Sequence, residues 1–269
     1  NGEICVIGDI EDARAFIKPY IRETHLIQSM FLSRNVAHGH VYLKLENMQL
    51  TGSFKFRGAN NKINHLTPEQ RAKGIITASA GNHAQGVALT AKLLGIDATV
   101  VMPEEAPLAK QQATAGYGAN VVLHGATFND SRLYMEQLAA EKGLTIVHPY
   151  DDREVMAGQG TIGLEILDAI WNVDTVIGGC GLISGIATAL KSFNPSIHII
   201  GVQSENVHGM TASFEAGTIT SHHADFTLAD GTDVAIPGEL TFPVVQNLVD
   251  EMILVSEKEI ATAMKDLMQ

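Results

Sequence analysis

A lysine at the start of an expected helix is the first residue that could do unusual chemistry. In TGSFKFRGAN, residues 51–60, hydroxyl side chains can accept the first free N–H groups of a helix. Lys55 then lies in the first turn, at the positive end of the helix dipole, with Arg57 two residues further on. The positive end of the helix, the charge of Arg57 and burial between Phe54 and Phe56 all oppose protonation of the Lys55 amine. The sequence therefore predicts a nucleophilic Lys55 amine of lowered pKa, the alternative being an ordinary solvated lysine.

A glycine-rich segment forms a second candidate site. IGGCGLISG, residues 177–185, follows the β-branched run VDTVI and precedes a segment of helical period. Its glycines permit positive φ angles, so backbone N–H groups can converge at a helix N-terminus, as in phosphate sites. A tight strand-to-helix turn would explain the same pattern. No Walker lysine follows and no acidic residue lies roughly 20 positions on, which disfavours a nucleoside triphosphate or a dinucleotide and leaves a smaller phosphate ester.

Another expected strand-to-helix turn could bind a carboxylate. In ASAGNHAQGVA, residues 78–88, small and polar residues follow an apolar run. Doubly wound sheets bind ligands where such turns leave the carboxyl ends of the strands, and the helix dipole there favours an anion. We expect several free backbone N–H groups to face outward, those of Ser79, Gly81, Asn82 and His83. The plainer interpretation is a helix capped by Asn82 and His83.

Together these features indicate one cofactor. Pyridoxal phosphate needs a lysine amine for its Schiff base and a cup for its phosphate, and its amino-acid substrates carry a carboxylate. Lys55, residues 177–185 and residues 79–83 supply a candidate for each requirement. The sequence therefore predicts a pyridoxal-phosphate enzyme that acts on a small-molecule amino acid.

The elements that must position these residues alternate between strand and helix. The expected strands are residues 41–45, 74–79, 98–102, 119–125, 144–150, 173–177, 197–203 and 252–256. The expected helices begin near residue 53, cover 82–94, 108–115, 129–142, 154–170, 183–193 and 208–215, and begin again at residue 257. This alternation predicts an α/β fold of two doubly wound lobes with mostly parallel sheets.

We expect residues 1–70 and 151–269 to form a large cofactor-binding domain and residues 71–150 a small substrate-carboxylate domain. The polar segment 149–158 is the expected crossover between the lobes. The turn-rich segment 222–242 is long enough to predict a functional or disordered loop, with His222 and His223 as a solvated pair.

Composition excludes several classes of partner. The 269 residues include 30 acidic and 18 basic ones, for a formal net charge of -12, and Lys or Arg form no run. Nucleic acid and anionic membranes are therefore not expected partners. Two cysteines make no disulfide framework, and the first residues do not resemble a signal peptide. We expect a soluble cytoplasmic protein.

Six segments in order resemble the serine/threonine dehydratases among the fold-type II pyridoxal-phosphate enzymes, whose fold is tryptophan synthase β-like. They are ENMQLTGSFKFRGANNKI, SAGNHAQGVAL, AGQGTIGLEI, GGCGLISGIA, GVQSENVHGM and LADGTDV. The chain is most similar to catabolic bacterial members, which lack a C-terminal regulatory domain. The resemblance implies a lyase that converts L-threonine or L-serine to 2-oxobutyrate or pyruvate plus ammonia.

The resemblance also implies roles for individual residues. Lys55 matches the Schiff-base lysine, Phe54 the residue packed near the ring and Asn82 the side chain that hydrogen-bonds the cofactor's 3′-oxygen. The phosphate loop matches Gly178, Gly179, Cys180, Gly181 and Leu182. The substrate carboxylate is expected at the turn of Ser79, Ala80, Gly81, Asn82 and His83.

Two departures from the family pattern stand out. Cys180 replaces a loop glycine, which would cost about 1–3 kcal/mol if its φ were positive. The chain also stops before the EGAGA-like and SGGN-like segments of the family, the second of which meets the pyridine nitrogen. We therefore expect the large domain to be incomplete at its C-terminus, which leaves a catalytically impaired or shortened family member as an alternative.

A racemase is the other alternative, because serine racemases share this fold. They need a serine where this chain has Ala80, and carboxylates for a divalent cation where it has Gln203 and Gly209. The sequence therefore favours the dehydratase without a metal. The family also implies a nucleotide effector and a homo-dimer or homo-tetramer.

Overall fold

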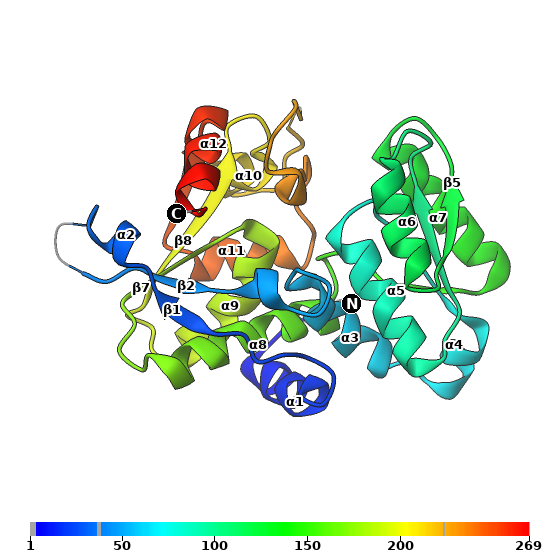
Figure 1. Ribbon diagram of the computed structural model, residues 1–269, viewed down its shortest axis with the longest axis horizontal. Helices are drawn as coiled ribbons and strands as arrows, with labels where there is room; N and C mark the ends of the chain where they lie inside the picture. Colours follow the sequence, from blue (N-terminus) through cyan, green and yellow to red (C-terminus); the bar gives the residue numbers. More distant parts are fainter. Residues whose placement is uncertain (1–3, 37–38, 223, 269) are drawn as a thin grey trace. The chain divides into compact units, whose positions relative to one another are not determined.

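The computed structural model describes residues 4–36, 39–222 and 224–268. Contacts between Cα atoms divide the chain into two compact units (Figure 1). The first unit holds residues 1–10, 23–45 and 160–269, and the second holds residues 11–22 and 46–159. This partition places residues 46–70 in the second unit, whereas the predicted large domain included them. The assignment of cofactor binding to one domain and of substrate binding to the other stays a prediction.

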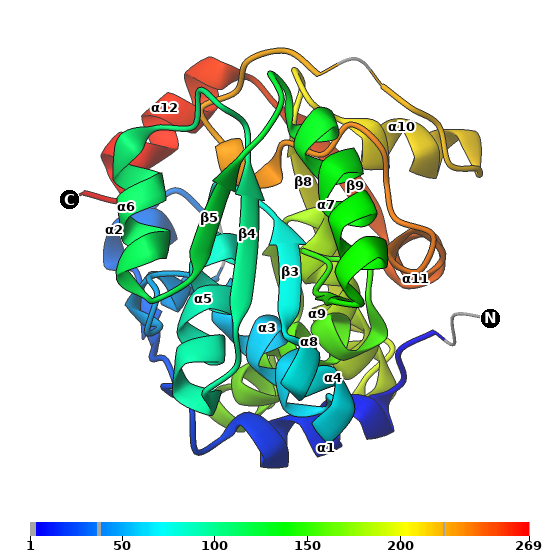
Figure 2. The same cartoon turned by 90° about the vertical axis from the view of Figure 1, so that its right-hand side faces the viewer.

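The second unit is built on a parallel four-stranded sheet of order β5-β4-β3-β6. Its strands are β3 (Ile75–Ala78), β4 (Ala98–Met102), β5 (Asn120–Leu123) and β6 (Thr145–Ile146). The helices that connect or precede these strands are α3 (Lys55–Asn64), α4 (Pro68–Lys73), α5 (Asn82–Leu94), α6 (Leu108–Gly116) and α7 (Phe128–Lys142). Figure 2 shows β5, β4 and β3 side by side.

Alternating side chains give this sheet two buried faces. Ile75 and Val100 pack with residues of α3 and α5 in one core cluster. Ile76 and Val101, their neighbours in sequence, pack with Met135 and other residues of α7 in a second cluster. Because successive strand residues point to opposite faces, apolar runs such as ATVVM can be buried on both sides, as in a doubly wound fold. The predicted α/β class with mostly parallel sheets is confirmed.

The first unit carries a second parallel sheet, of order β7-β8-β9. Its strands are β7 (Thr175–Gly178), β8 (His198–Ser204) and β9 (Glu251–Val255). The helices of this unit include α9 (Cys180–Phe193), α10 (Gly209–Ala216), α11 (Thr241–Leu248) and α12 (Glu257–Asp266). A short antiparallel pair, β1 (Leu26–Gln28) with β2 (Tyr42–Lys44), flanks α2 (Met30–Ser33).

Two helices, α1 (Ile7–Ile17) and α8 (Arg153–Ala169), contribute residues to both units. The glycines of α8 allow close approach to other helices. In the second unit an added Cβ on Gly158 would lie 2.6 Å from the Cα of Gly58 in α3. In the first unit a Cβ on Gly163 would lie 2.9 Å from the Cβ of Ala189 in α9. Glycine is therefore required in α8 because neighbouring helices leave no room for a side chain.

The turn-rich segment 222–242 holds a short 3-10 helix, η2 (Asp230–Thr232), and ends at α11. His222 is not surrounded by solvent alone, because the centre of its ring lies 3.8 Å from the centre of the His208 ring. His223 lies outside the described residues. In the part of the chain that the structure describes, no helix has both the length and the apolar character needed to cross a membrane.

Candidate active site

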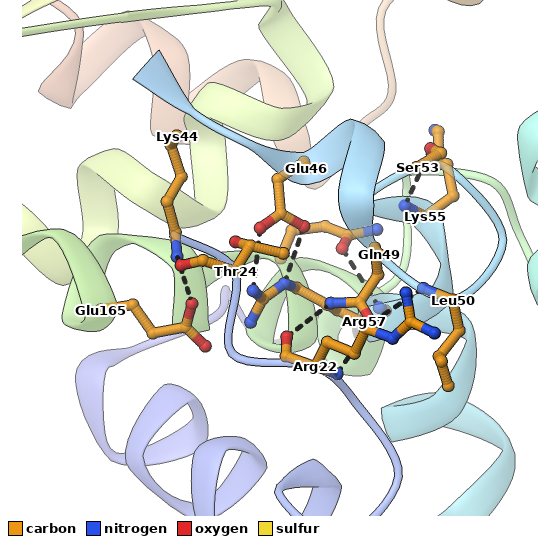
Figure 3. A network of polar contacts seen from close by, with 12 residues as sticks. Arg22, Thr24, Lys44, Glu46, Gln49, Leu50, Ser53, Lys55, Arg57 and Glu165 are labelled. Carbon is orange, nitrogen blue, oxygen red and sulfur yellow. Dashed lines mark hydrogen bonds and ion pairs between the residues drawn. The ribbon is translucent and has the colours of Figure 1, made fainter. Parts of the chain in front are cut away.

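Lys55 lies in the first turn of α3, as the sequence predicted, and is the first residue of that helix, which was expected to begin near residue 53. The hydroxyl of Ser53 accepts its backbone N–H at 3.2 Å, so a hydroxyl residue does serve the helix start (Figure 3). The Lys55 amine donates to the backbone carbonyl of Pro149 at 2.7 Å and lies 5.4 Å from the centre of the Phe54 ring. The reactive end of the side chain is therefore placed by one carbonyl and one aromatic face.

Burial lowers the pKa of the Lys55 amine from 10.5 to about 8, although the residue as a whole is only half-buried. Loss of hydration disfavours the ammonium form, which explains the direction. At pH 7 about a tenth of such amines are unprotonated, against about one in 3,000 for an ordinary lysine. The structure thus supports the predicted nucleophilic amine.

Arg57 does not act in the way the sequence suggested. Its guanidinium is fully buried and forms two hydrogen bonds with the Glu46 carboxylate, from Nε at 2.9 Å and from a terminal nitrogen at 2.8 Å (Figure 3). The carboxylate offsets the positive charge that was expected to oppose protonation of Lys55. Desolvation, and not repulsion from Arg57, is the cause of the lowered pKa of Lys55.

The turn between β3 and α5 offers fewer free N–H groups than expected, but still enough for an anion. The N–H of Ser79 donates to the Val101 carbonyl, and the N–H of Gly81 donates to the Ser79 hydroxyl at 3.2 Å. Within the described residues, the N–H groups of Ala80, Asn82 and His83 have no protein acceptor. Three unpaired donors at the N-terminus of a 13-residue helix fit a carboxylate.

The cap of α5 is also different from the plainer interpretation. The Ser79 hydroxyl accepts the N–H of Gly81 and that of Ala84, whereas Asn82 and His83 are the first two helical residues. No hydrogen bond to the Asn82 side chain occurs within the described part of the chain. Its amide is therefore available to a ligand, and the cofactor contact that the resemblance implied stays a prediction.

His83 is a buried neutral imidazole. Its Nε2 lies 2.9 Å from the Val147 carbonyl, and burial, with the nearby Lys55 charge, lowers its pKa to about 3. Its Nδ1 is buried without a partner in the described structure. The backbone N–H of His83, and not its ring, is the group that fits a carboxylate.

The glycine loop of the first unit is a helix N-terminus and not a strained nest. Gly178 ends β7, Gly179 caps α9 with φ -74°, and Cys180 and Gly181 already belong to the helix, followed by Leu182. The expected positive φ angles are not needed, because helical backbone is open to any residue, and a non-glycine residue at position 180 costs no strain of that kind. The first N–H groups of a 14-residue helix remain suited to a phosphate.

Sequence reasoning missed the role of the segment after β6. It treated Pro149 as part of a polar hinge, but the Pro149 carbonyl accepts the Lys55 amine. Strand β6 runs parallel to β3, with Ile76 opposite Ile146, so the residues that follow both strands emerge at the same edge of the sheet. The strand order would have indicated this contact, but the sequence alone did not supply that order.

Known proteins resemble this chain in sequence and in fold. The chain is 73% identical, over its full length and 79% of the relative, to the L-threonine dehydratase catabolic TdcB of Staphylococcus aureus strain N315. Among solved structures it is similar to the T.th. threonine deaminase, with a TM-score of 0.92, 38% identity and coverage of 98% of this chain and 86% of the other. It is also similar to maize serine racemase, with a TM-score of 0.93, 38% identity and coverage of 98% and 80%.

A family model described as pyridoxal-phosphate dependent enzyme matches residues 17–269. The match includes Lys55, the turn of residues 79–83 and the helix N-terminus at Gly179. The chain belongs to the family of pyridoxal-phosphate-dependent enzymes.

Proposed function

We propose that this protein is a pyridoxal-phosphate-dependent L-threonine dehydratase that also accepts L-serine. It converts threonine to 2-oxobutyrate and ammonia, or serine to pyruvate and ammonia. The observation that carries the proposal is the buried Lys55 amine, with its pKa lowered to about 8, in a chain 73% identical to a catabolic L-threonine dehydratase.

The described residues fit the cofactor in their donor chemistry. Lys55 would hold it covalently, the Asn82 amide would bond its ring oxygen, and the N-terminus of α9, residues 178–182, would bind its phosphate. Phe54 lies beside the amine and would pack near the ring. When bound, the cofactor supplies an electron sink for the negative charge that develops at the substrate Cα.

The chain's own residues provide binding and proton transfer. The unpaired N–H groups of Ala80, Asn82 and His83 bind the substrate carboxylate. The Lys55 amine, in its unprotonated form, accepts the proton of the substrate Cα. Loss of the β-hydroxyl as water, followed by hydrolytic loss of ammonia, balances the conversion of threonine to 2-oxobutyrate.

A racemase is disfavoured by packing in the first unit. A Cβ at Gly209 would lie 2.3 Å from the backbone oxygen of Ala235, so no carboxylate side chain fits there without a backbone shift. The Gln203 side chain is buried and accepts from the backbone N–H of Thr211 at 2.8 Å and from its hydroxyl at 2.9 Å. Among the described residues, no three His, Cys, Asp or Glu side chains cluster as a metal site would need.

The proposal is tested by an absorbance spectrum of the purified protein with added cofactor, followed by assay of 2-oxobutyrate from threonine. We expect a visible band and product from the wild type, and neither from Lys55→Ala. Lys92→Ala, at an exposed lysine of α5, is the matched control and should behave as the wild type. Absence of both signals in the wild type would support the catalytically impaired alternative, and D-serine formed from L-serine without pyruvate would support the racemase.

Further aspects of the proposal concern assembly and regulation. We infer a cytoplasmic homo-dimer or homo-tetramer that acts in amino-acid catabolism or isoleucine biosynthesis, with a nucleotide such as AMP as effector. The proposed division of labour gives residues 1–70 and 151–269 to the cofactor and residues 71–150 to the substrate carboxylate. The family resemblance supports these inferences.

A further inference from the structure

The segment that follows β6 supplies the carbonyl that contacts the Lys55 amine. The Val147 carbonyl, just before this segment, accepts from the Thr77 hydroxyl at 2.8 Å and lies 2.9 Å from Nε2 of His83. The next carbonyl but one, that of Pro149, accepts from the Lys55 amine at 2.7 Å. The start of the segment is therefore anchored to β3 and α5, and its Pro149 carbonyl faces α3.

His148 fixes the other end of this segment. Its Nδ1 lies 2.8 Å from the backbone nitrogen of Asp151 and 3.3 Å from that of Tyr150. Backbone N–H groups only donate, so Nδ1 accepts both bonds and the ring proton is on Nε2. The His148 ring also contacts the Tyr150 ring edge-on, with centres 4.7 Å apart. The His148 imidazole thus holds the backbone on the C-terminal side of Pro149 in a turn.

Pro149 limits the freedom that remains. Its ring fixes φ near about -65°, and it restricts the backbone of the preceding His148 to extended conformations. With Val147 anchored on one side and Tyr150 and Asp151 anchored on the other, the direction of the Pro149 carbonyl is set by its neighbours. Any loss of the bonds to His148 would release that carbonyl on one side.

We propose that His148 is a positioning residue for Lys55: by accepting the N–H groups of Tyr150 and Asp151, it directs the Pro149 carbonyl at the Lys55 amine. The inference rests on the proposed function only in taking Lys55 as the reactive lysine. His148 needs no contact with substrate or cofactor for this role. It acts through the backbone of the segment from residue 148 to residue 151.

The role requires a neutral His148, and its surroundings favour that form. Burial is the main cause that lowers its pKa below 6.5, and the positive charges of Lys55 and Arg132 add to it, while Asp151 and Asp152 act in the opposite direction. His83 and Tyr150 are also titratable neighbours, and both are neutral, since burial lowers the pKa of His83 to about 3 and raises the pKa of Tyr150 to about 12. Protonation of Nδ1 would turn the acceptor into a donor and set it against two N–H groups, so the Lys55 amine should lose its carbonyl partner only in acid.

The test measures the pKa of the Lys55 amine in the cofactor-free protein, from the pH dependence of its acylation by an amine reagent, read by mass spectrometry of the Lys55 peptide. In the wild type we expect a pKa of about 8. In His148→Ala the ammonium form of Lys55 loses its carbonyl acceptor while the amine stays desolvated, so its pKa should fall below about 8. His148→Asn places an amide oxygen where Nδ1 was and should restore the wild-type value.

Controls separate this role from general stability. His124→Ala, at an exposed histidine of the same unit, should leave the Lys55 pKa unchanged. Pro149→Ala keeps the carbonyl but frees φ, so an intermediate fall in the Lys55 pKa is expected, and it serves as the second variant if His148→Ala does not fold. A folded His148→Ala, or in its place Pro149→Ala, with a Lys55 pKa still near 8 would overturn the proposal.

Kinetics of the cofactor-loaded enzyme provide an independent measurement. We expect His148→Ala to lower kcat by about tenfold or more with little change in KM for threonine, because the carboxylate turn is untouched. His148→Asn should recover most of kcat. If the wild type shows no dehydratase activity but the Lys55 pKa responds as stated, the proposed function fails and the positioning role of His148 stands. If the wild type is active but the Lys55 pKa does not respond, the positioning role fails and the proposed function stands.

Discussion

At the scale of single residues, burial sets the chemistry of this protein more than neighbouring charge does. Lys55 and His83 both have lowered pKa values, and in both the largest cause is loss of hydration. Each keeps one backbone carbonyl as a partner, that of Pro149 for Lys55 and that of Val147 for His83. Burial thus raises the unprotonated fraction of the Lys55 amine at neutral pH and keeps the His83 imidazole neutral well below pH 6.5.

Burial of His83 predicts a loss of stability in acid. The pKa of His83 is about 3 in the folded protein against 6.5 for the free side chain, so between these values only the unfolded chain binds the proton. The free energy of unfolding should therefore be highest above pH 6.5 and fall as the pH decreases toward 3, with a loss of a few kcal/mol from this residue. Urea unfolding at a series of pH values, in wild type and His83→Gln, measures the contribution.

The control for that measurement is His124→Gln, a change at an exposed histidine of the same unit. It should reproduce the wild-type pH profile, whereas His83→Gln should flatten it. Equal profiles for wild type and His83→Gln would show that His83 is not held neutral by burial.

At the scale of elements, α3 is the helix on which the second unit depends. It carries Lys55 at its first position, and its Gly58 approaches α8 so closely that an added Cβ would lie 2.5 Å from the Gln159 side chain. The buried Arg57 of the same helix binds Glu46 through two nitrogens. In the first unit, the Lys44 amine of β2 forms an ion pair with the Glu165 carboxylate of α8, with Nζ and Oε2 2.5 Å apart (Figure 3).

Removal of one partner of the Arg57–Glu46 pair should destabilise the protein strongly. Arg57→Met leaves the Glu46 carboxylate, which is 12% exposed, without its guanidinium partner, and we expect a loss of about 3–5 kcal/mol in the free energy of unfolding. Glu46→Leu combined with Arg57→Met should recover most of that loss, since apolar replacement of a buried pair is often neutral. Chemical denaturation of the three proteins gives both values.

Arg132→Met is the matched control for the pair. Arg132 and Glu136 form an exposed ion pair one turn apart on α7, so its loss should cost at most about 1 kcal/mol. A cost for Arg57→Met no greater than that for Arg132→Met would contradict the importance given to burial of the pair.

At the scale of the whole molecule, the sequence predicted the bounds of helices and strands better than it predicted which strands lie side by side. Strand β4 (Ala98–Met102) and helix α5 (Asn82–Leu94) have the predicted bounds, because an apolar β-branched run and a periodic helix bounded by glycine are local signals. Short elements such as α2 (Met30–Ser33) were not predicted, since their few residues leave no period to read. Strand order was also beyond local signals, and with it the contact between Lys55 and Pro149.

The candidate site divides in the same way. The lowered pKa of Lys55 was predicted from residue type and position and agrees with its burial, whereas the carboxylate turn stays a prediction. The acceptor of the Ser79 N–H and the carboxylate partner of Arg57 depend on residues distant in sequence, Val101 and Glu46, so the predicted number of free donors and the predicted effect of Arg57 were wrong. The sequence predicted properties that depend on adjacent residues, but it did not predict hydrogen bonds between residues that are distant in the chain.

The whole catalytic proposal depends on a covalent bond between Lys55 and the cofactor. Borohydride reduction of the cofactor-loaded protein, followed by proteolysis and mass spectrometry, detects that bond itself, with Lys92 and the other lysines of the same digest as internal controls. We expect a stable pyridoxyl group on the Lys55 peptide, and none when excess threonine is added before reduction. A pyridoxyl group on a different lysine, or none on Lys55 in a protein that forms 2-oxobutyrate, would refute the assignment of Lys55.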